Sequence, residues 1–159
     1  MNNQKKILVL CTGNSCRSIM AEGLINHFLV GSEMCIRDSS NPAGFVHPMS
    51  IKTLKKSGIL KSDYKSQSWD EFSDMDFDLV ITVCDNAAGE SCPVYLSSAP
   101  KVHWGVEDPA KFKGSEEEIE NEFQRVYEIL AKRTHAMVEK YSYTKKLQLE
   151  ELKLIGNLI

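Results

Sequence analysis

Lys5-Lys6-Ile7-Leu8-Val9-Leu10, followed at once by Cys11-Thr12-Gly13-Asn14-Ser15-Cys16-Arg17-Ser18, decides the fold of this 159-residue chain. The first run is apolar without polar alternation, which is typical of a strand buried on both faces of a parallel sheet. Apolar residues then recur at helical spacing after the loop, at Ile19, Met20, Leu24, Ile25 and Phe28. The stretch therefore predicts a buried strand, a tight loop and a helix that begins at Ser18.

The rest of the chain continues this alternation of strands and helices. A helix is predicted with Pro48 in its first turn and Gly58 as its stop, and the capping box Ser115-Glu116-Glu117-Glu118 starts a long helix. Helices are expected over 48–59, 68–72, 115–141 and 147–159, and strands over 77–83 and 101–104. This order predicts a single α/β domain with a parallel sheet.

The loop between the first strand and helix has the composition of an oxyanion site. Its backbone N–H groups and the helix N-terminus favour an anion, Gly13 permits the tight turn, and Arg17 offers a planar two-pronged clamp. The same positive field favours the thiolate of Cys11, to which Ser18 can donate a hydrogen bond. The predicted oxyanion-binding residues are Thr12, Gly13, Asn14, Ser15, Cys16 and Arg17. The alternative is that Cys11 is a buried small apolar residue.

Charge and cysteine content restrict the other classes of function. The formal net charge is −3 and the basic residues form no block, so we expect no nucleic-acid partner. No apolar run approaches the roughly 20 residues of a membrane span, and the apolar stretch near the start is too short for a signal peptide. We therefore expect a cytoplasmic protein, and a domain of this size is expected by default to be a monomer. In that compartment five cysteines indicate chemistry or packing, because static disulfides are rare there, and their spacing does not favour zinc.

Three motifs together resemble one known family. They are VLCTGNSCRSIMAE at 9–22, ITVCDNAAGESCP at 81–93 and HWGVEDPA at 103–110. They resemble the low-molecular-weight protein tyrosine phosphatase superfamily, and more closely its arsenate reductase branch. The resemblance implies a three-layer α/β domain over residues 1–141, with a four-stranded parallel sheet flanked by helices. Residues 142–159 form a helical tail to which the resemblance assigns no role.

The resemblance also implies a chemistry for particular residues. Cys11 forms a covalent adduct with arsenate, for which phosphate or sulfate are analogues, and Asp108, held by Pro109, acts as general acid. Cys84 then attacks Cys11 and releases arsenite, Cys92 attacks Cys84, and thioredoxin or a similar thiol carrier reduces the resulting disulfide. The implied catalytic residues are Cys11, Arg17, Ser18, Cys84, Cys92 and Asp108. Without the resemblance, Asp108-Pro109 is an ordinary loop signal, and Cys84 and Cys92 are packed or metal-binding cysteines.

Two alternatives to the reductase stay open at the level of sequence. One is a phosphatase acting on phosphate monoesters, although Ala110 and Lys111 stand where that branch carries aromatic residues. The other is a catalytically silent module that binds oxyanions. No cofactor is required for the reductase, but the resemblance places a potassium ion near the loop, with ligands at Asn14, Glu22 and Asp70. His103 and Trp104 are expected to be structural.

Residues 30–39 depart from the family pattern. Relatives carry a second strand ending in a Ser-Ala-Gly turn, whereas this chain reads Val30-Gly31-Ser32-Glu33-Met34-Cys35-Ile36-Arg37-Asp38-Ser39. That string resembles translated sequencing-adapter read-through, a foreign segment in which Cys35 has no role. On this interpretation we expect the domain to lack an edge strand, and also the serine that completes the potassium site.

Overall fold

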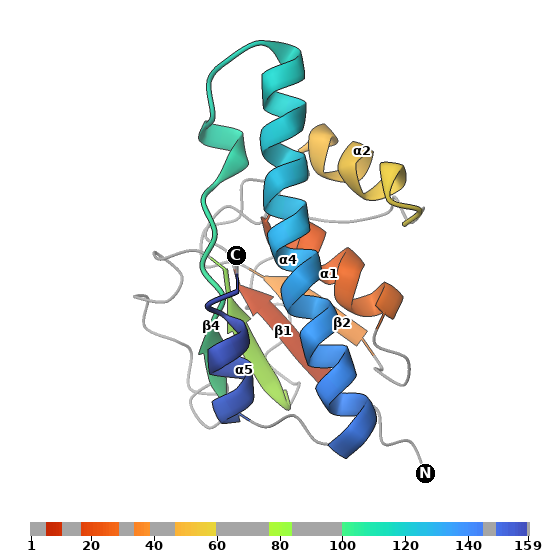
Figure 1. Ribbon diagram of the computed structural model, residues 1–159, viewed down its shortest axis with the longest axis vertical. Helices are drawn as coiled ribbons and strands as arrows, with labels where there is room; N and C mark the ends of the chain where they lie inside the picture. Colours follow the sequence, from red (N-terminus) through yellow and green to blue (C-terminus); the bar gives the residue numbers. More distant parts are fainter. Residues whose placement is uncertain are drawn as a thin grey trace.

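The fold is taken from a computed structural model that describes residues 6–10, 17–28, 34–38, 47–59, 77–83, 100–144 and 149–158. Several predicted features lie outside these residues: the short helix at 68–72, the loop residues 11–16, and Asp70, Cys84 and Cys92. The described parts contain the sheet, the helices packed against it and the segment that carries Asp108 (Figure 1).

Four parallel strands form the sheet, in the order β2-β1-β3-β4. They are β1 (Lys6–Leu10), β2 (Met34–Asp38), β3 (Leu79–Thr82) and β4 (Lys101–His103). All four residues of β3 are buried, as are 7–10 of β1, which agrees with a central position in a parallel sheet. The predicted four-stranded parallel sheet is confirmed.

The expectation of a missing edge strand is wrong. Residues Met34–Asp38 pair with β1 in parallel register, from Lys6 opposite Met34 to Leu10 opposite Asp38. The reason lies in the tertiary structure. Without a neighbouring strand, the outer edge of β1 would have unpaired N–H and C=O groups inside the domain. Pairing with residues 34–38 gives these groups hydrogen-bond partners. The segment therefore serves as the edge strand, although its sequence departs from the family pattern.

The helices begin and end close to where the sequence predicts. Helix α1 (Arg17–Phe28) starts one residue earlier than predicted, and α2 (Pro48–Lys56) has Pro48 in its first turn. Gly58 follows α2 with a φ of 88°, a left-handed conformation that glycine adopts without strain. Helix α4 (Glu116–Thr144) extends three residues past the predicted end at 141. Its capping box is present, with reciprocal 3.2 Å hydrogen bonds between Ser115 and Glu118.

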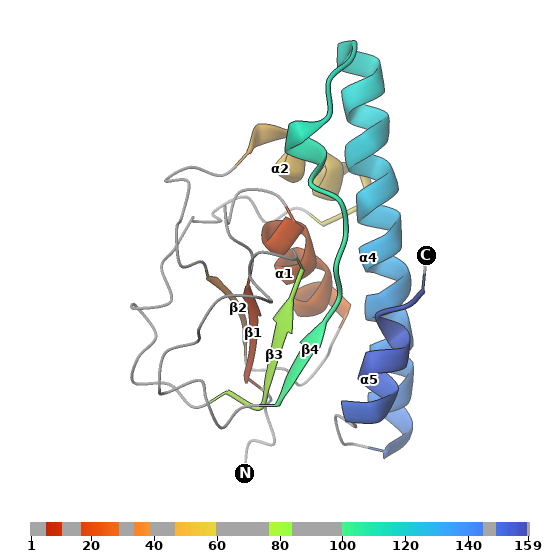
Figure 2. The ribbon, with the colours of Figure 1, turned by 90° about the vertical axis from the view of Figure 1, so that its left-hand side faces the viewer.

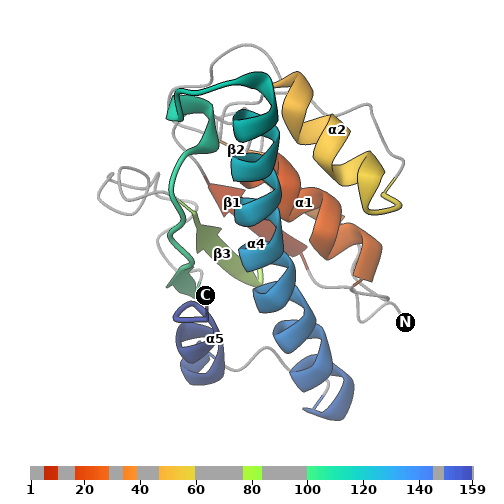
Figure 3. The same ribbon diagram turned by 45° about the horizontal axis from the view of Figure 1, so that its top comes forward.

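Helices α1 and α4 lie side by side on one face of the sheet, and α2 packs against the first half of α4 (Figures 2 and 3). The helical spacing of the tail is confirmed over α5 (Leu149–Ile155), which packs beside β4 and the second half of α4. Trp104 and Phe123 are the largest fully buried side chains of the core. None of the helices in the described ranges has the length and apolar character that crossing a bilayer demands.

Candidate active site

The topology brings the ends of β1 and β3 together at one edge of the sheet. β1 pairs with β2 on one side and with β3 on the other, so the order of the strands reverses at β1. Ligands of open α/β sheets bind at the carboxyl ends of the strands where the order reverses in this way. The carboxyl ends of β1 and β3 are joined there, because the Val83 N–H donates to the Leu10 carbonyl at 3.0 Å. Cys11 and Cys84 are the residues that follow this bonded pair in the chain.

Arg17 is the first residue of α1 and is almost fully buried. Its Nη1 donates to the Val106 carbonyl at 3.1 Å, and its Nη2 lies 3.5 Å from Oδ2 of Asp108. Its Nε is buried and, within the described part of the chain, has no hydrogen-bond partner. A buried N–H of a charged group needs an acceptor, so this atom is suited to bind an oxyanion oxygen.

Two further predicted residues lie on the buried side of α1. Ser18 is fully buried and Glu22 is 5% exposed, one helical turn later. Residues four apart lie on the same face of a helix, so both side chains face inward. Glu22 is an oxygen donor of the kind that alkali and alkaline-earth cations prefer. Among the described residues, no group of three His, Cys, Asp or Glu side chains is placed to hold a metal ion.

Asp108 is held from two directions. Its Oδ1 accepts a 3.0 Å hydrogen bond from the Ala110 N–H, which caps the short 3₁₀ helix η3 (Pro109–Lys111), and its Oδ2 faces Arg17. Pro109 is buried and fixes the first turn of η3. Because the carboxyl side chain is about one-fifth exposed, it can exchange a proton with solvent while staying next to the oxyanion clamp.

His47 also belongs to this region, because the charge of Asp108 acts on its imidazole ring. It is the N-cap of α2: its Nδ1 accepts a 3.2 Å hydrogen bond from the Met49 N–H, and its ring packs against Phe123. Burial lowers the pKa of His47 below its ordinary value, and the negative charge of Asp108 opposes this effect. The sequence signal is its position directly before Pro48 at the start of a helix.

The structure thus places Arg17 beside Asp108, and it places Ser18 and Glu22 on the same helix as Arg17. The other predicted site residues lie outside the described ranges. Trp104 is fully buried, as expected for a structural residue. His103 is exposed and shares a 2.8 Å hydrogen bond with Thr82, and its structural role stays a prediction. Sequence reasoning missed the Val106 carbonyl as a partner of Arg17. A contact across 89 positions has no local signal.

Comparison with known proteins places these features in context. A sequence profile for "Low molecular weight phosphotyrosine protein phosphatase" matches residues 6–150. An arsenate reductase of Halalkalibacterium halodurans is 41% identical over 137 residues, which cover 86% of this chain and 97% of that protein. An arsenate reductase of Bacillus subtilis strain 168 is 38% identical over 135 residues, covering 85% and 96% of the two chains.

A solved structure has a similar fold. It is described as an arsenate reductase in the phosphate binding state, and it superposes with a TM-score of 0.70 at 28% identity. The superposition covers 86% of this chain and 98% of that one.

Proposed function

Because this chain belongs to the low molecular weight phosphotyrosine protein phosphatase family, we propose that it is an arsenate reductase that converts arsenate to arsenite. The observation that carries the proposal is the junction of Arg17 with Asp108 at the edge where β1 and β3 end side by side. An oxyanion clamp, a proton donor and the strand ends that precede Cys11 and Cys84 meet there. The relatives that are about 40% identical are arsenate reductases.

The first step is attack of the Cys11 thiolate on arsenic. A sulfur–arsenic bond forms and one arsenic–oxygen bond breaks, and the departing oxygen takes a proton from Asp108 and leaves as water. Arg17 holds the remaining oxygens and balances their charge. Arsenic keeps its oxidation state in this step, which a phosphate ester would undergo in the same way.

Reduction occurs in the steps that follow. The Cys84 thiolate attacks the sulfur of Cys11, a disulfide forms, and the electron pair of the sulfur–arsenic bond stays on arsenic, which leaves as arsenite. Cys92 then attacks Cys84 and frees Cys11, leaving a Cys84–Cys92 disulfide. The two electrons that arsenic gains come from two thiols. Thioredoxin or a similar dithiol carrier restores them, which fits a cytoplasmic enzyme.

A phosphatase would share the first step, attack by the Cys11 thiolate, but its reaction would not require the thiols of Cys84 and Cys92. Ala110 and Lys111 in η3, directly after Asp108-Pro109, are both exposed and provide no aromatic wall for a tyrosyl ring. This favours a small inorganic oxyanion over phosphotyrosine as substrate. Potassium has a supporting role in the proposal: Glu22, with Asn14 and Asp70, would hold the ion and add positive charge near the loop.

The direct test is turnover of arsenate with thioredoxin, thioredoxin reductase and NADPH, followed by NADPH oxidation. We expect arsenate-dependent turnover, and slow or no hydrolysis of p-nitrophenyl phosphate. Rapid ester hydrolysis without arsenate reduction would support the phosphatase instead. A folded chain that turns over neither compound, yet binds phosphate, would support the silent oxyanion-binding module.

A further inference from the structure

Residues 104–108, here called the acid segment, connect β4 to Asp108 and run along the end of β3. Backbone hydrogen bonds join Trp104 to Thr82 at 2.7 Å and Val106 to Val83 at 3.2 Å. Arg17 holds the segment from the side of the site, through the Val106 carbonyl and Asp108. The position of the acid therefore depends on this short piece of backbone.

Arg133 of α4 holds the same segment from the opposite end. Its Nη1 donates to the carbonyls of Trp104 at 2.7 Å and Gly105 at 3.2 Å, and its Nε donates to the Leu158 carbonyl at 3.0 Å. The residue is only 4% exposed, and burial lowers the pKa of its guanidinium. Burying a charge against neutral carbonyls costs free energy, so a contact of this kind calls for a reason beyond packing.

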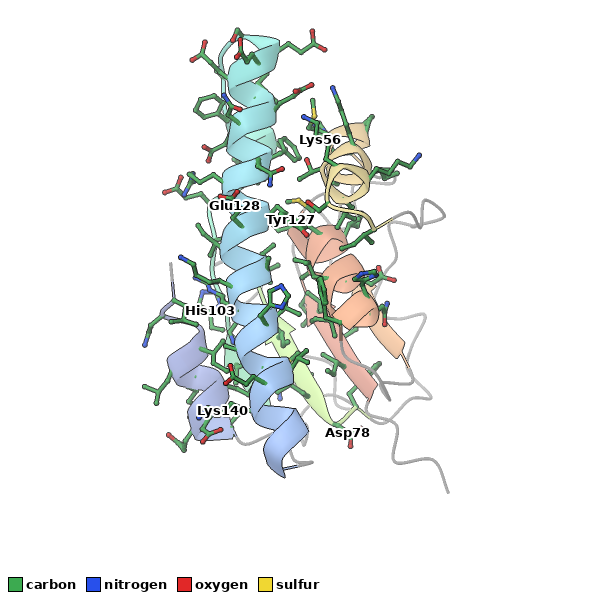
Figure 4. The ribbon with its side chains drawn as sticks, turned by 45° about the vertical axis from the view of Figure 1, so that its right-hand side comes forward. Lys56, Asp78, His103, Tyr127, Glu128 and Lys140 are labelled. Atoms are coloured by element: carbon green, nitrogen blue, oxygen red, sulfur yellow. The ribbon has the colours of Figure 1, made fainter. Side chains whose placement is uncertain are left out.

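The tail supports the acid segment as well. The Trp104 Nε1 donates to the Leu152 carbonyl of α5 at 3.0 Å. A Cβ atom on Gly156 would lie 2.8 Å from the His103 carbonyl and 3.0 Å from the Trp104 ring, so the end of α5 approaches β4 as closely as glycine allows. His103 is labelled beside α5 in Figure 4. The family profile ends at residue 150, so most of α5 lies beyond it.

Side-chain packing fixes only part of this segment: Trp104 is fully buried and Val106 packs against the core, whereas Gly105 between them has no side chain. A hollow of about 370 Å³ lies between the acid segment and the end of α5, lined by His103, Gly105, Val106, Glu107, Gly156 and Asn157. Space of this size beside the backbone leaves room on one side of Gly105. The hydrogen bonds from Arg133 therefore restrain a part of the chain that has room to move.

We propose that Arg133 is a positioning residue for Asp108: with α5, it fixes the Trp104 end of the acid segment so that the carboxyl group stays beside Arg17. The inference rests on the proposed role of Asp108 as general acid. It predicts that loss of Arg133 acts on turnover through Asp108, whereas a purely structural contact would lower stability without depending on the acid.

The experiment compares Arg133→Met, which keeps the length of the side chain but removes every donor, with Arg125→Met as matched control. Arg125 also lies on α4 and contacts the acid segment, at Glu107 (3.0 Å). The Arg125 side chain is about half exposed and that of Glu107 is largely exposed, and such ion pairs contribute little to stability. Each substitution is made in the wild-type chain and in Asp108→Asn. Gly156→Val, which pushes α5 away from β4, is a second probe if Arg133→Met does not fold.

We expect Asp108→Asn to lower kcat for arsenate by about a hundredfold or more, as removal of a general acid does. Arg133→Met should lower kcat by about tenfold with little change in KM, and it should flatten the basic limb of the pH profile of kcat. In the Asp108→Asn background, the same substitution should lower kcat by less than about twofold. Gly156→Val should change kcat in the same way as Arg133→Met. Arg125→Met should keep the kcat of the wild type.

The inference is overturned if folded Arg133→Met or Gly156→Val keeps the kcat of the wild type. It is also overturned if either substitution lowers kcat as much in the Asp108→Asn background as in the wild-type chain. If Asp108→Asn itself turns over arsenate at the wild-type rate, the proposed acid fails, and the positioning inference fails with it. If Asp108→Asn lowers kcat but Arg133→Met keeps the kcat of the wild type, the positioning inference is rejected and the proposed acid is retained.

Discussion

A lysine in place of Arg17 would keep the positive charge but lose the planar set of donors. The arginine bonds Val106 through Nη1 and faces Asp108 through Nη2, which leaves Nε for an oxyanion. A single ammonium group cannot reach these positions at once. We expect Arg17→Lys to weaken competitive inhibition by phosphate by about tenfold to a hundredfold, the loss of one or two charged hydrogen bonds. An unchanged inhibition constant in a folded variant would contradict the clamp.

His47 gives the fold a pH dependence near neutrality. Burial lowers its pKa in the folded chain, so the unfolded chain takes up a proton first as the pH falls. Stability from this group is present above about pH 6.5 and is lost as the pH falls through the folded pKa, where protonation also removes the Nδ1 acceptor that caps α2.

His47→Asn keeps an N-cap acceptor but does not titrate. Between about pH 7.5 and pH 5.5, chemical denaturation should show wild type losing stability relative to this variant. If the difference in the free energy of unfolding stays constant over that range, the pKa of His47 is not lowered by folding.

At the scale of elements, the capping box fixes where α4 starts. Ser115 and Glu118 each satisfy a backbone N–H that the helix leaves unpaired. Ser115→Ala should lower the free energy of unfolding by about 1 kcal/mol, whereas Ser115→Thr keeps the hydroxyl and most of that stability. Equal stability of the two variants in urea denaturation would show that the cap contributes nothing.

The register of β2 places Cys35 away from the site. It stands opposite Ile7, whereas the strands that precede Cys11 and Cys84 end at the level of Leu10 and Thr82. Three residues of strand correspond to roughly 10 Å. Cys35→Ser should therefore keep the rate of arsenate turnover, and a large loss of rate in a stable variant would assign this thiol a role.

Elements with strong local signals are those that the sequence predicts well. Each of these signals acts within one helical turn or one strand. They are the buried run before Cys11, the proline and glycine at the two ends of α2, and the capping box of α4. β2 was missed because its formation depends on the open edge of β1 and not on its own pattern. Arg133 was missed although it interrupts the buried stripe of Val126, Leu130 and Met137, because its carbonyl partners are 25 to 29 residues away.

In the whole molecule, the sheet order places the strands that precede Cys11 and Cys84 next to each other. The switch point at β1 is a property of topology, and it joins the ends of strands that lie about 70 residues apart in the chain. Arg17 and Asp108 could be predicted from their motifs, but their contact and its support by Val106 and Arg133 required the folded chain.

We expect the chain to reduce arsenate with three of its own thiols, and a single turnover of reduced protein, in which arsenite release is measured, tests this mechanism. No external reductant is added, so each electron must come from the chain. Wild type should release one equivalent of arsenite and form the Cys84–Cys92 disulfide. Cys92→Ser should release one equivalent and stop with Cys11 bonded to Cys84, and Cys84→Ser should release none. Full arsenite release from Cys84→Ser would contradict the relay.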